Sequence, residues 1–117
     1  MPAPAAPSLA LPAVAAALAL LAAPAASAGP PTPIDLGRDK FVQCASCHGS
    51  DGRSTVIPQY PKIGGQSAPY VVNALKAYRD GRRIGTFAAI MAEVAKPLSD
   101  ADMENLAAYV ESLDAGK

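Results

Sequence analysis

The two cysteines and the one histidine of this chain all lie in one short segment, Cys44-Ala45-Ser46-Cys47-His48. Two thiols separated by two residues can each add to a vinyl group of one haem, and the adjacent imidazole can then coordinate its iron. The segment therefore predicts one haem c, held covalently by Cys44 and Cys47, with His48 as an iron ligand. The rest of the chain must then fold around a large apolar cofactor.

Two other kinds of site use the same residue types. A thiol-disulfide centre also has two cysteines at this spacing in exported proteins, but a thioredoxin-like centre follows a strand of a βαβ unit. No segment of this chain alternates in the pattern of a strand. A zinc site needs four ligands, and the chain has no further Cys or His to complete one. Haem attachment is the preferred interpretation.

Residues 1–28 have the pattern of an export signal. The stretch from Leu9 to Ala23 is an apolar run, and the small residues of Ala26-Ser27-Ala28 fit a signal peptidase site. We therefore expect cleavage after Ala28 and a periplasmic location. The first basic residue is Arg38, so only the terminal amine supplies the positive charge with which such a leader opens. A retained membrane anchor is the alternative, but the run contains a proline and is shorter than the roughly 20 residues of a spanning helix.

The remaining chain predicts one small domain. Residues 29–33 are rich in proline and are predicted to be a flexible tail, so the domain covers residues 34–117. A domain of this size buries little surface and is marginal unless a disulfide, metal or cofactor completes its core. Acidic and basic residues number 10 each, and this balance argues against a nucleic-acid partner.

Three helices and no strand are predicted, so the fold class is all-α. The first helix runs from Asp35 into Cys44, with an apolar stripe of Leu36, Phe41 and Val42. A second begins at the potential cap Ser67 and ends at Gly81. The third begins at Ser99, with Asp102 three residues on as in a capping box. Its predicted buried face consists of Met103, Leu106, Ala107, Val110 and Leu113.

The segment from Gly49 to Gln66 is rich in Gly, Pro and Ser and predicts a long irregular loop. Loops of this length without regular structure are uncommon in small domains unless they serve a site. Because this loop begins at His48, we expect it to form part of the cofactor pocket.

A second axial ligand must come from a residue other than histidine, and a methionine thioether is a natural soft donor to haem iron. Met1 belongs to the leader, and Met103 falls on the buried face of the last helix, which leaves Met91. From the residues alone two interpretations remain open, because Met91 also shares one helical face with Phe87, Ile90 and Val94 and could fill the core.

The chain resembles the class I cytochromes c, in particular the small bacterial ones, in four segments. Gly37-x-x-x-Phe41-x-x-Cys44 is similar to the first helix of that family, and Leu106-Ala107-Ala108-Tyr109 to its partner in the last helix. Pro61-x-x-Gly64-Gly65-Gln66 resembles the loop whose proline carbonyl accepts a hydrogen bond from the haem histidine. Met91 with Ala95-Lys96-x-Leu98-Ser99-Asp100-x-Asp102 resembles the stretch that follows the axial methionine.

This resemblance implies short helices and a long loop wrapped around one haem, with His48 and Met91 as the axial ligands of the iron. It also implies Tyr70, Leu75, Arg79 and Arg82 around the haem rim. An iron with two protein ligands has no open position for a substrate, so the expected function is one-electron transfer between a redox-protein donor and acceptor, without enzyme activity. Membrane contact is expected only through partner complexes.

Three alternative functions remain at the level of sequence. The chain could be the haem subunit of a periplasmic dehydrogenase, a gas-binding sensor with an exchangeable Met91, or a thiol oxidoreductase. Copurification with a partner would indicate the dehydrogenase subunit, and carbon monoxide binding to the reduced protein would indicate the sensor. The absence of haem would indicate the thiol oxidoreductase.

Overall fold

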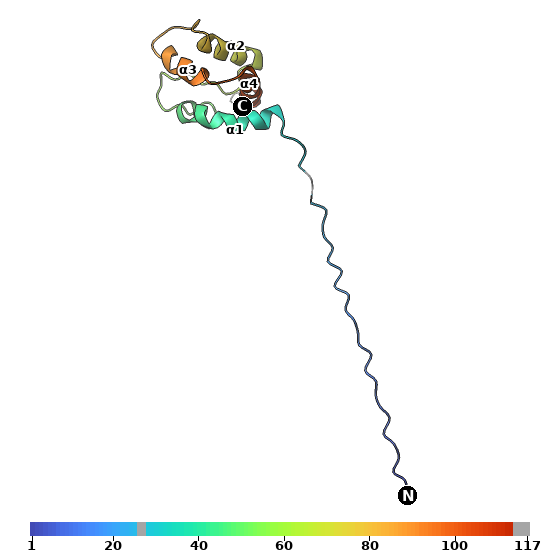
Figure 1. The fold of residues 1–117 in the computed structure, drawn as a ribbon. Coiled ribbons are helices and arrows are strands. Elements are labelled where there is room, and N and C mark those ends of the chain that lie inside the picture. Colours follow the sequence, from blue (N-terminus) through green and yellow to red (C-terminus); the bar gives the residue numbers. More distant parts are fainter. Residues whose placement is uncertain (26–27, 114–117) are drawn as a thin grey trace.

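The computed structural model describes residues 1–25 and 28–113 and shows four helices, α1 (Pro33–His48), α2 (Ala68–Arg79), α3 (Ala88–Ala95) and α4 (Asp100–Ser112). No strand occurs in these residues, which confirms the all-α prediction. Residues 1–25 form neither helix nor strand and extend away from the helices (Figure 1). Within the described part, no helix is long and apolar enough to cross a membrane. Ala26 and Ser27 of the expected cleavage site and residues 114–117 of the expected domain lie outside the described residues.

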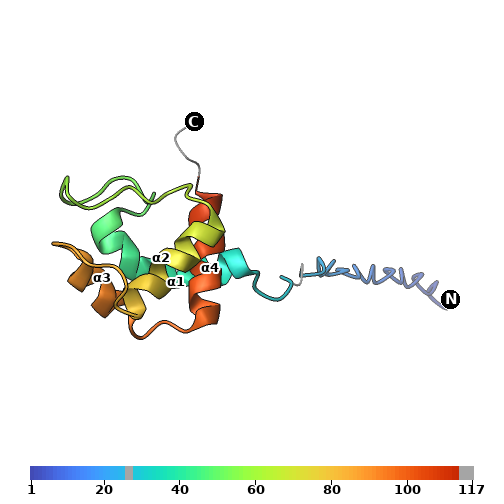
Figure 2. The ribbon, with the colours of Figure 1, turned by 90° about the horizontal axis from the view of Figure 1, so that it is seen from above.

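The contact between α1 and α4 is the most extensive one between helices (Figure 2). It depends on Gly37, because a Cβ atom at that position would lie 2.0 Å from the backbone oxygen of Asn105. One turn later, the rings of Phe41 and Tyr109 meet edge to face with centroids 5.1 Å apart. Both contacts confirm the pairing of first and last helix that the family resemblance implies.

Helix α1 is longer than predicted at both ends. It begins at Pro33, the last residue of the expected tail, because Thr32 forms a capping box in which its hydroxyl accepts from the Asp35 amide and the Asp35 carboxylate accepts from the Thr32 amide. Proline suits the first helical position because it lacks the amide hydrogen that would stay unpaired there. The helix continues past Cys44 to His48 and stops at Gly49, whose φ of 84° favours glycine.

The predicted apolar stripe of α1 was wrong in two of its three members. Phe41 is buried, but Leu36 is 43% exposed and Val42 is 73% exposed. The buried side of α1 is set by its contact with α4 and by the cofactor pocket, so that Gly37, Phe41 and His48 share it instead. A glycine and a histidine carry no hydrophobic periodicity, and the sequence pattern therefore misplaced this face.

The chain between α1 and α2 contains only turns and bends, which confirms the long irregular loop. Amides of Ile63 and Gly64 donate to the carbonyl of Gly52, at 2.8 Å and 3.0 Å, and so join the two arms of the loop. The amide of Gly65 donates to the carbonyl of Val110 at 2.8 Å and ties the loop to α4. The loop is thus fixed by backbone hydrogen bonds rather than by regular structure.

The capping predictions for the two later helices had different outcomes. At α4, the Ser99 hydroxyl accepts from the Asp102 amide at 3.0 Å and the Asp102 carboxylate accepts from the Ser99 amide, which confirms the capping box. At α2, Ser67 stands at the cap position but its side chain makes no capping hydrogen bond. The amide of Ala68 donates instead to the carboxylate of Glu111, at 2.5 Å.

Helix α3 was not predicted as a separate element, although the spacing of Phe87, Ile90, Met91 and Val94 indicated helical periodicity. It packs on α2, while α2 also packs on α4. Among the described residues, the backbones of α1 and α3 do not contact each other. The end of α1 and helix α3 are therefore separated, and residues of both line the cavity of the candidate site.

Candidate functional site

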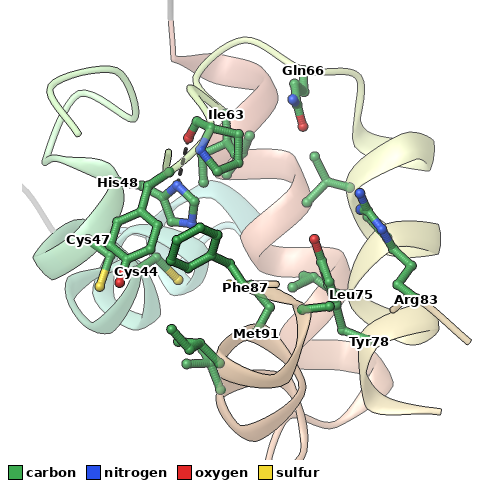
Figure 3. Close-up of a pocket in the computed structure, with 18 of the residues that line it drawn as sticks. Cys44, Cys47, His48, Ile63, Gln66, Leu75, Tyr78, Arg83, Phe87 and Met91 are labelled. Carbon is green, nitrogen blue, oxygen red and sulfur yellow. Dashed lines mark hydrogen bonds between the residues drawn. The ribbon is translucent and has the colours of Figure 1, made fainter. Parts of the chain in front are cut away.

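A cavity of about 370 Å³ lies between the end of α1, the irregular loop, α2 and α3. Its walls are largely apolar, with contributions from Phe41, Ile63, Val71, Leu75 and Val94. All four residues that the sequence assigned to the haem site line this cavity, namely Cys44, Cys47, His48 and Met91 (Figure 3). The fold thus brings a residue of α3 into one pocket with three residues of α1.

Cys44, Cys47 and His48 form the last turn of α1. Their spacing of three and four residues places them on one face of the helix. His48 is only 6% exposed, and its Nδ1 atom lies 2.8 Å from the carbonyl oxygen of Pro61. A carbonyl can only accept, so Nδ1 carries the proton and Nε2 keeps the lone pair that coordinates a metal. The hydrogen bond confirms the role of Pro61 that the family resemblance implies.

The two cysteines are half-buried, and they are free thiols rather than a disulfide in this structure. Burial and the neighbouring Cys47 raise the pKa of the Cys44 thiol to about 11. Reactive thiol-disulfide centres have the opposite property, a thiol pKa lowered toward neutrality. The environment of Cys44 therefore argues against the thiol oxidoreductase and agrees with a thioether.

The two methionines of the domain lie in different environments. Met91 is partly buried on α3 and lines the cavity. Met103 is fully buried between the helices and does not line the cavity, which confirms its predicted place in the core of α4. Of these two methionines, only Met91 lines the pocket that also contains His48.

Sequence reasoning missed several residues of the pocket. The Tyr60 ring lies 6.4 Å from the His48 ring and 5.6 Å from the Phe87 ring, measured between centroids, so a chain of aromatic contacts connects the loop with the start of α3. Tyr60 directly precedes Pro61, and this adjacency was the one sequence feature that could have placed it near His48. Phe87 was noted only as part of a helical pattern.

Of the four rim residues implied by the resemblance, two line the cavity and two do not. Tyr70 and Leu75 line the cavity as implied, but Arg79 and Arg82 do not. Arg79 donates to the carboxylate of Asp100 at 2.7 Å, and Arg82 to that of Asp80 at 3.3 Å. The arginine in the lining is Arg83.

The donor set of the pocket fits a haem. Two thiols stand together at one end, the His48 imidazole also lines the pocket, and a thioether and apolar walls complete the lining. These are the groups that bind the vinyl carbons, the iron and the apolar ring of a c-type haem.

Comparison with known proteins supports this assignment. Residues 34–114 match the family model of cytochrome c. Cytochrome c-554(548) of Halomonas halodenitrificans is 49% identical over 76 residues, which cover 65% of this chain and 90% of that protein. Cytochrome c4 of Pseudomonas aeruginosa is 36% identical over 76 residues, but they cover only 36% of its length.

A solved structure gives the same result. The crystal structure of reduced recombinant cytochrome c4 from Pseudomonas stutzeri matches with a TM-score of 0.64 and 32% identity, over 73% of this chain and 50% of that one. This chain therefore spans half or less of the cytochromes c4 it matches, and most of cytochrome c-554(548).

The motif, the fold and the matched relatives agree on one covalently bound haem c, attached at Cys44 and Cys47, that transfers electrons. The family model covers more than half of the sequence. This chain belongs to the cytochrome c family.

Proposed function

We propose that this protein is a periplasmic carrier that shuttles one electron at a time through a haem with His48 and Met91 as axial ligands, and that it is not itself an enzyme. The observation that carries this proposal is the shared cavity, which His48 enters from α1 and Met91 from α3 (Figure 3). Two protein ligands on the iron leave no position for a substrate.

The residues around the cavity have distinct roles in this proposal. The bound haem supplies a one-electron ferric-ferrous couple. The Pro61 carbonyl holds the His48 ring in one orientation and strengthens Nε2 as a donor. The Met91 thioether and the apolar walls favour the lower charge of the ferrous state, and so raise the reduction potential above that of a histidine-only haem.

Replacement of Met91 tests the ligation. Met91→Ala is expected to erase the weak ferric sulfur-to-iron absorption at the red end of the visible spectrum, lower the potential and open the iron to carbon monoxide or cyanide. The control is Met103→Leu, which conserves volume, costs under about 1.5 kcal/mol and leaves the band intact. If Met91→Ala keeps the band and Met103→Leu loses it, the assignment is wrong. Carbon monoxide binding to reduced wild-type protein would favour the sensor.

We further propose that residues 1–28 are removed during export, and that the mature protein begins with a short proline-rich segment before the helical domain, whose first helix starts at Pro33. Residues 1–25 have no part in the helical domain (Figure 1), and the family match begins only at residue 34. Intact-mass analysis of protein isolated from the periplasm tests this, with a mature chain beginning at Gly29 as the expected result. Retained residues 1–28 would contradict it.

A second candidate function is a haem subunit of a periplasmic dehydrogenase. It is favoured by a relative from Thiomonas intermedia named thiosulfate dehydrogenase electron acceptor, which is 35% identical over 72 residues and of which this chain covers 32%. Gentle purification of the tagged protein from its own cells distinguishes the two. A free carrier is expected to elute without a stoichiometric partner, whereas a subunit elutes with its dehydrogenase.

A further inference from the structure

Among the residues that the structure describes, Arg83 is the one with a fixed charge in the lining of the haem cavity. The other polar side chains of this lining are amides, hydroxyls, thiols and an imidazole, and none of the described lining residues is Asp, Glu or Lys. The described lining therefore has a single cationic position, in the connection between α2 and α3.

The three arginines of this region differ in their partners. Arg79 and Arg82 each pair with a carboxylate of the protein, Asp100 and Asp80 respectively. Among residues 1–25 and 28–113, no carboxylate pairs with Arg83. Its guanidinium carbon lies 4.4 Å from the centre of the Tyr78 ring, in a cation-π contact that holds it at the cavity.

The position of Arg83 relative to the cysteines is the decisive geometry. Figure 3 shows Arg83, Tyr78 and Gln66 on the side of the pocket away from Cys44 and Cys47. In a haem, the vinyl groups and the two carboxylate side chains stand on opposite edges of the ring. Since the thioethers fix the vinyl edge at Cys44 and Cys47, the carboxylate edge must face the side of Arg83.

We propose that Arg83 binds a carboxylate of the haem, with the Gln66 amide on the same side, and thereby helps to set the reduction potential. A guanidinium presents a planar fork of donors that matches a carboxylate. Its positive charge disfavours the additional charge of ferric iron, so Arg83 raises the potential. The same charge favours the ionised form of the haem carboxylate, so this group takes up a proton only below the neutral pH range.

Among the described residues, no carboxylate and no lysine of the protein lines the cavity. The lining does include the side chains of Tyr60, Tyr70 and Tyr78. The two thiols are consumed in thioethers, and His48 donates from Nδ1 to Pro61. The nearest other charges, Arg82 and Asp80, pair with each other outside the lining. A pH-dependent potential between pH 5 and 8 therefore reports the haem carboxylates.

The test compares Arg83→Gln with Arg82→Gln in the haem-containing protein. The two variants remove the same charge one residue apart, and only the first removes it from the cavity lining. Arg83→Gln is expected to shift the equilibrium toward ferric by up to tenfold, which lowers the potential by up to about 59 mV. The haem carboxylate of this variant is also expected to ionise at a higher pH, so that the potential falls with rising pH within the neutral range. Arg82→Gln and the charge-conserving Arg83→Lys keep a flat profile there.

Equal potentials and equal pH profiles of Arg83→Gln and Arg82→Gln overturn the proposal. If Arg83→Gln yields no haem-containing protein, nuclear Overhauser effects in the reduced wild-type protein decide. Contacts between the Arg83 side chain and the methylene protons beside the haem carboxylates support the proposal, and their absence overturns it. The proposal depends on the thioethers and not on Met91, so loss of the sulfur-to-iron band tests the axial ligand separately.

Discussion

Cys44 and Cys47 join the chain to its cofactor by bonds that do not depend on the fold. Mature protein is therefore expected to keep its haem during denaturing electrophoresis, because thioethers survive unfolding. Cys44→Ala removes one of the two bonds and should weaken or abolish attachment. Haem staining of the gel measures both results, and wild-type protein that loses all of its haem would contradict covalent attachment.

Asp51 stabilises the start of the irregular loop through local hydrogen bonds. Its carboxylate accepts from the amides of Ser54 at 2.7 Å and Arg53 at 2.8 Å, and from the Ser54 hydroxyl. These bonds lower the pKa of Asp51 from 3.8 to about 2. A lowered pKa contributes stability that is complete above the unfolded value and is lost as pH falls through the folded value.

The predicted consequence is a stability loss between about pH 4 and pH 2 that depends on Asp51. Asp51→Asn should lower the melting temperature at neutral pH and flatten its fall over this interval. Asp39→Asn, which removes an exposed carboxylate of α1, serves as the control and should retain the wild-type profile. If the melting temperature of Asp51→Asn falls between about pH 4 and pH 2 as it does in the wild type, the hydrogen bonds of Asp51 do not contribute to stability.

At the scale of residues, the haem attachment motif was predictable because its chemistry is local to one segment. The place of Arg83 was not predictable. Arg79, Arg82 and Arg83 are close in sequence, and which of them faces the cavity depends on Asp100, which belongs to α4. A sequence pattern does not contain such partners, and the two arginines that the family resemblance implies at the rim do not line the cavity.

At the scale of elements, Gly37 permits the close approach of α1 and α4. Gly37→Ala places a Cβ atom 2.0 Å from the Asn105 oxygen and 2.8 Å from the Tyr109 Cβ, so the helices must move apart. We expect a loss of about 1–3 kcal/mol in the free energy of unfolding, as for other overpacked sites. Denaturant titration measures it. Val42→Ala, at an exposed position of the same helix, is the control and should stay within about 0.5 kcal/mol of wild type.

The two serine caps allow a matched comparison. Ser99→Ala removes a hydroxyl that accepts from the Asp102 amide and should cost about 1 kcal/mol. Ser67→Ala removes a hydroxyl at the same helical position that makes no capping hydrogen bond, and it should cost much less. Thermal unfolding of both variants measures the difference. Equal losses would mean that the capping box of α4 does not contribute in solution.

The end of α2 and the start of α4 were more predictable than the buried face of α1. The ends of α2 and α4 follow from Gly81 and Ser99, whose effects are local to the backbone. The buried face of α1 depends on which side meets α4 and the haem. Likewise, the periodicity around Met91 correctly indicated a helix, but periodicity could not show that this face lines a cavity rather than a core of side chains.

At the scale of the whole molecule, the cofactor takes the place of a larger core. The buried apolar side chains of the described residues are few and gather mainly where α4 meets α1 and α2. They are Phe41, Val71, Ala95, Leu98, Met103, Leu106, Ala107 and Val110. Helix α3 and the irregular loop instead line the cavity, and the backbones of α1 and α3 do not meet among the described residues. The haem is therefore the apolar body on which these parts converge.

The last prediction follows from this arrangement: without haem, little stable structure should remain. Leader-free chain produced in a cytoplasm without haem-attachment machinery is expected to show low helical content and no cooperative thermal transition, because α3 and the loop lose the surface they cover. Circular dichroism during heating measures this, with the haem-containing protein as the control. A cooperative transition in the haem-free chain would instead mean that the contact between α1 and α4, with Phe41 against Tyr109, suffices to hold the fold.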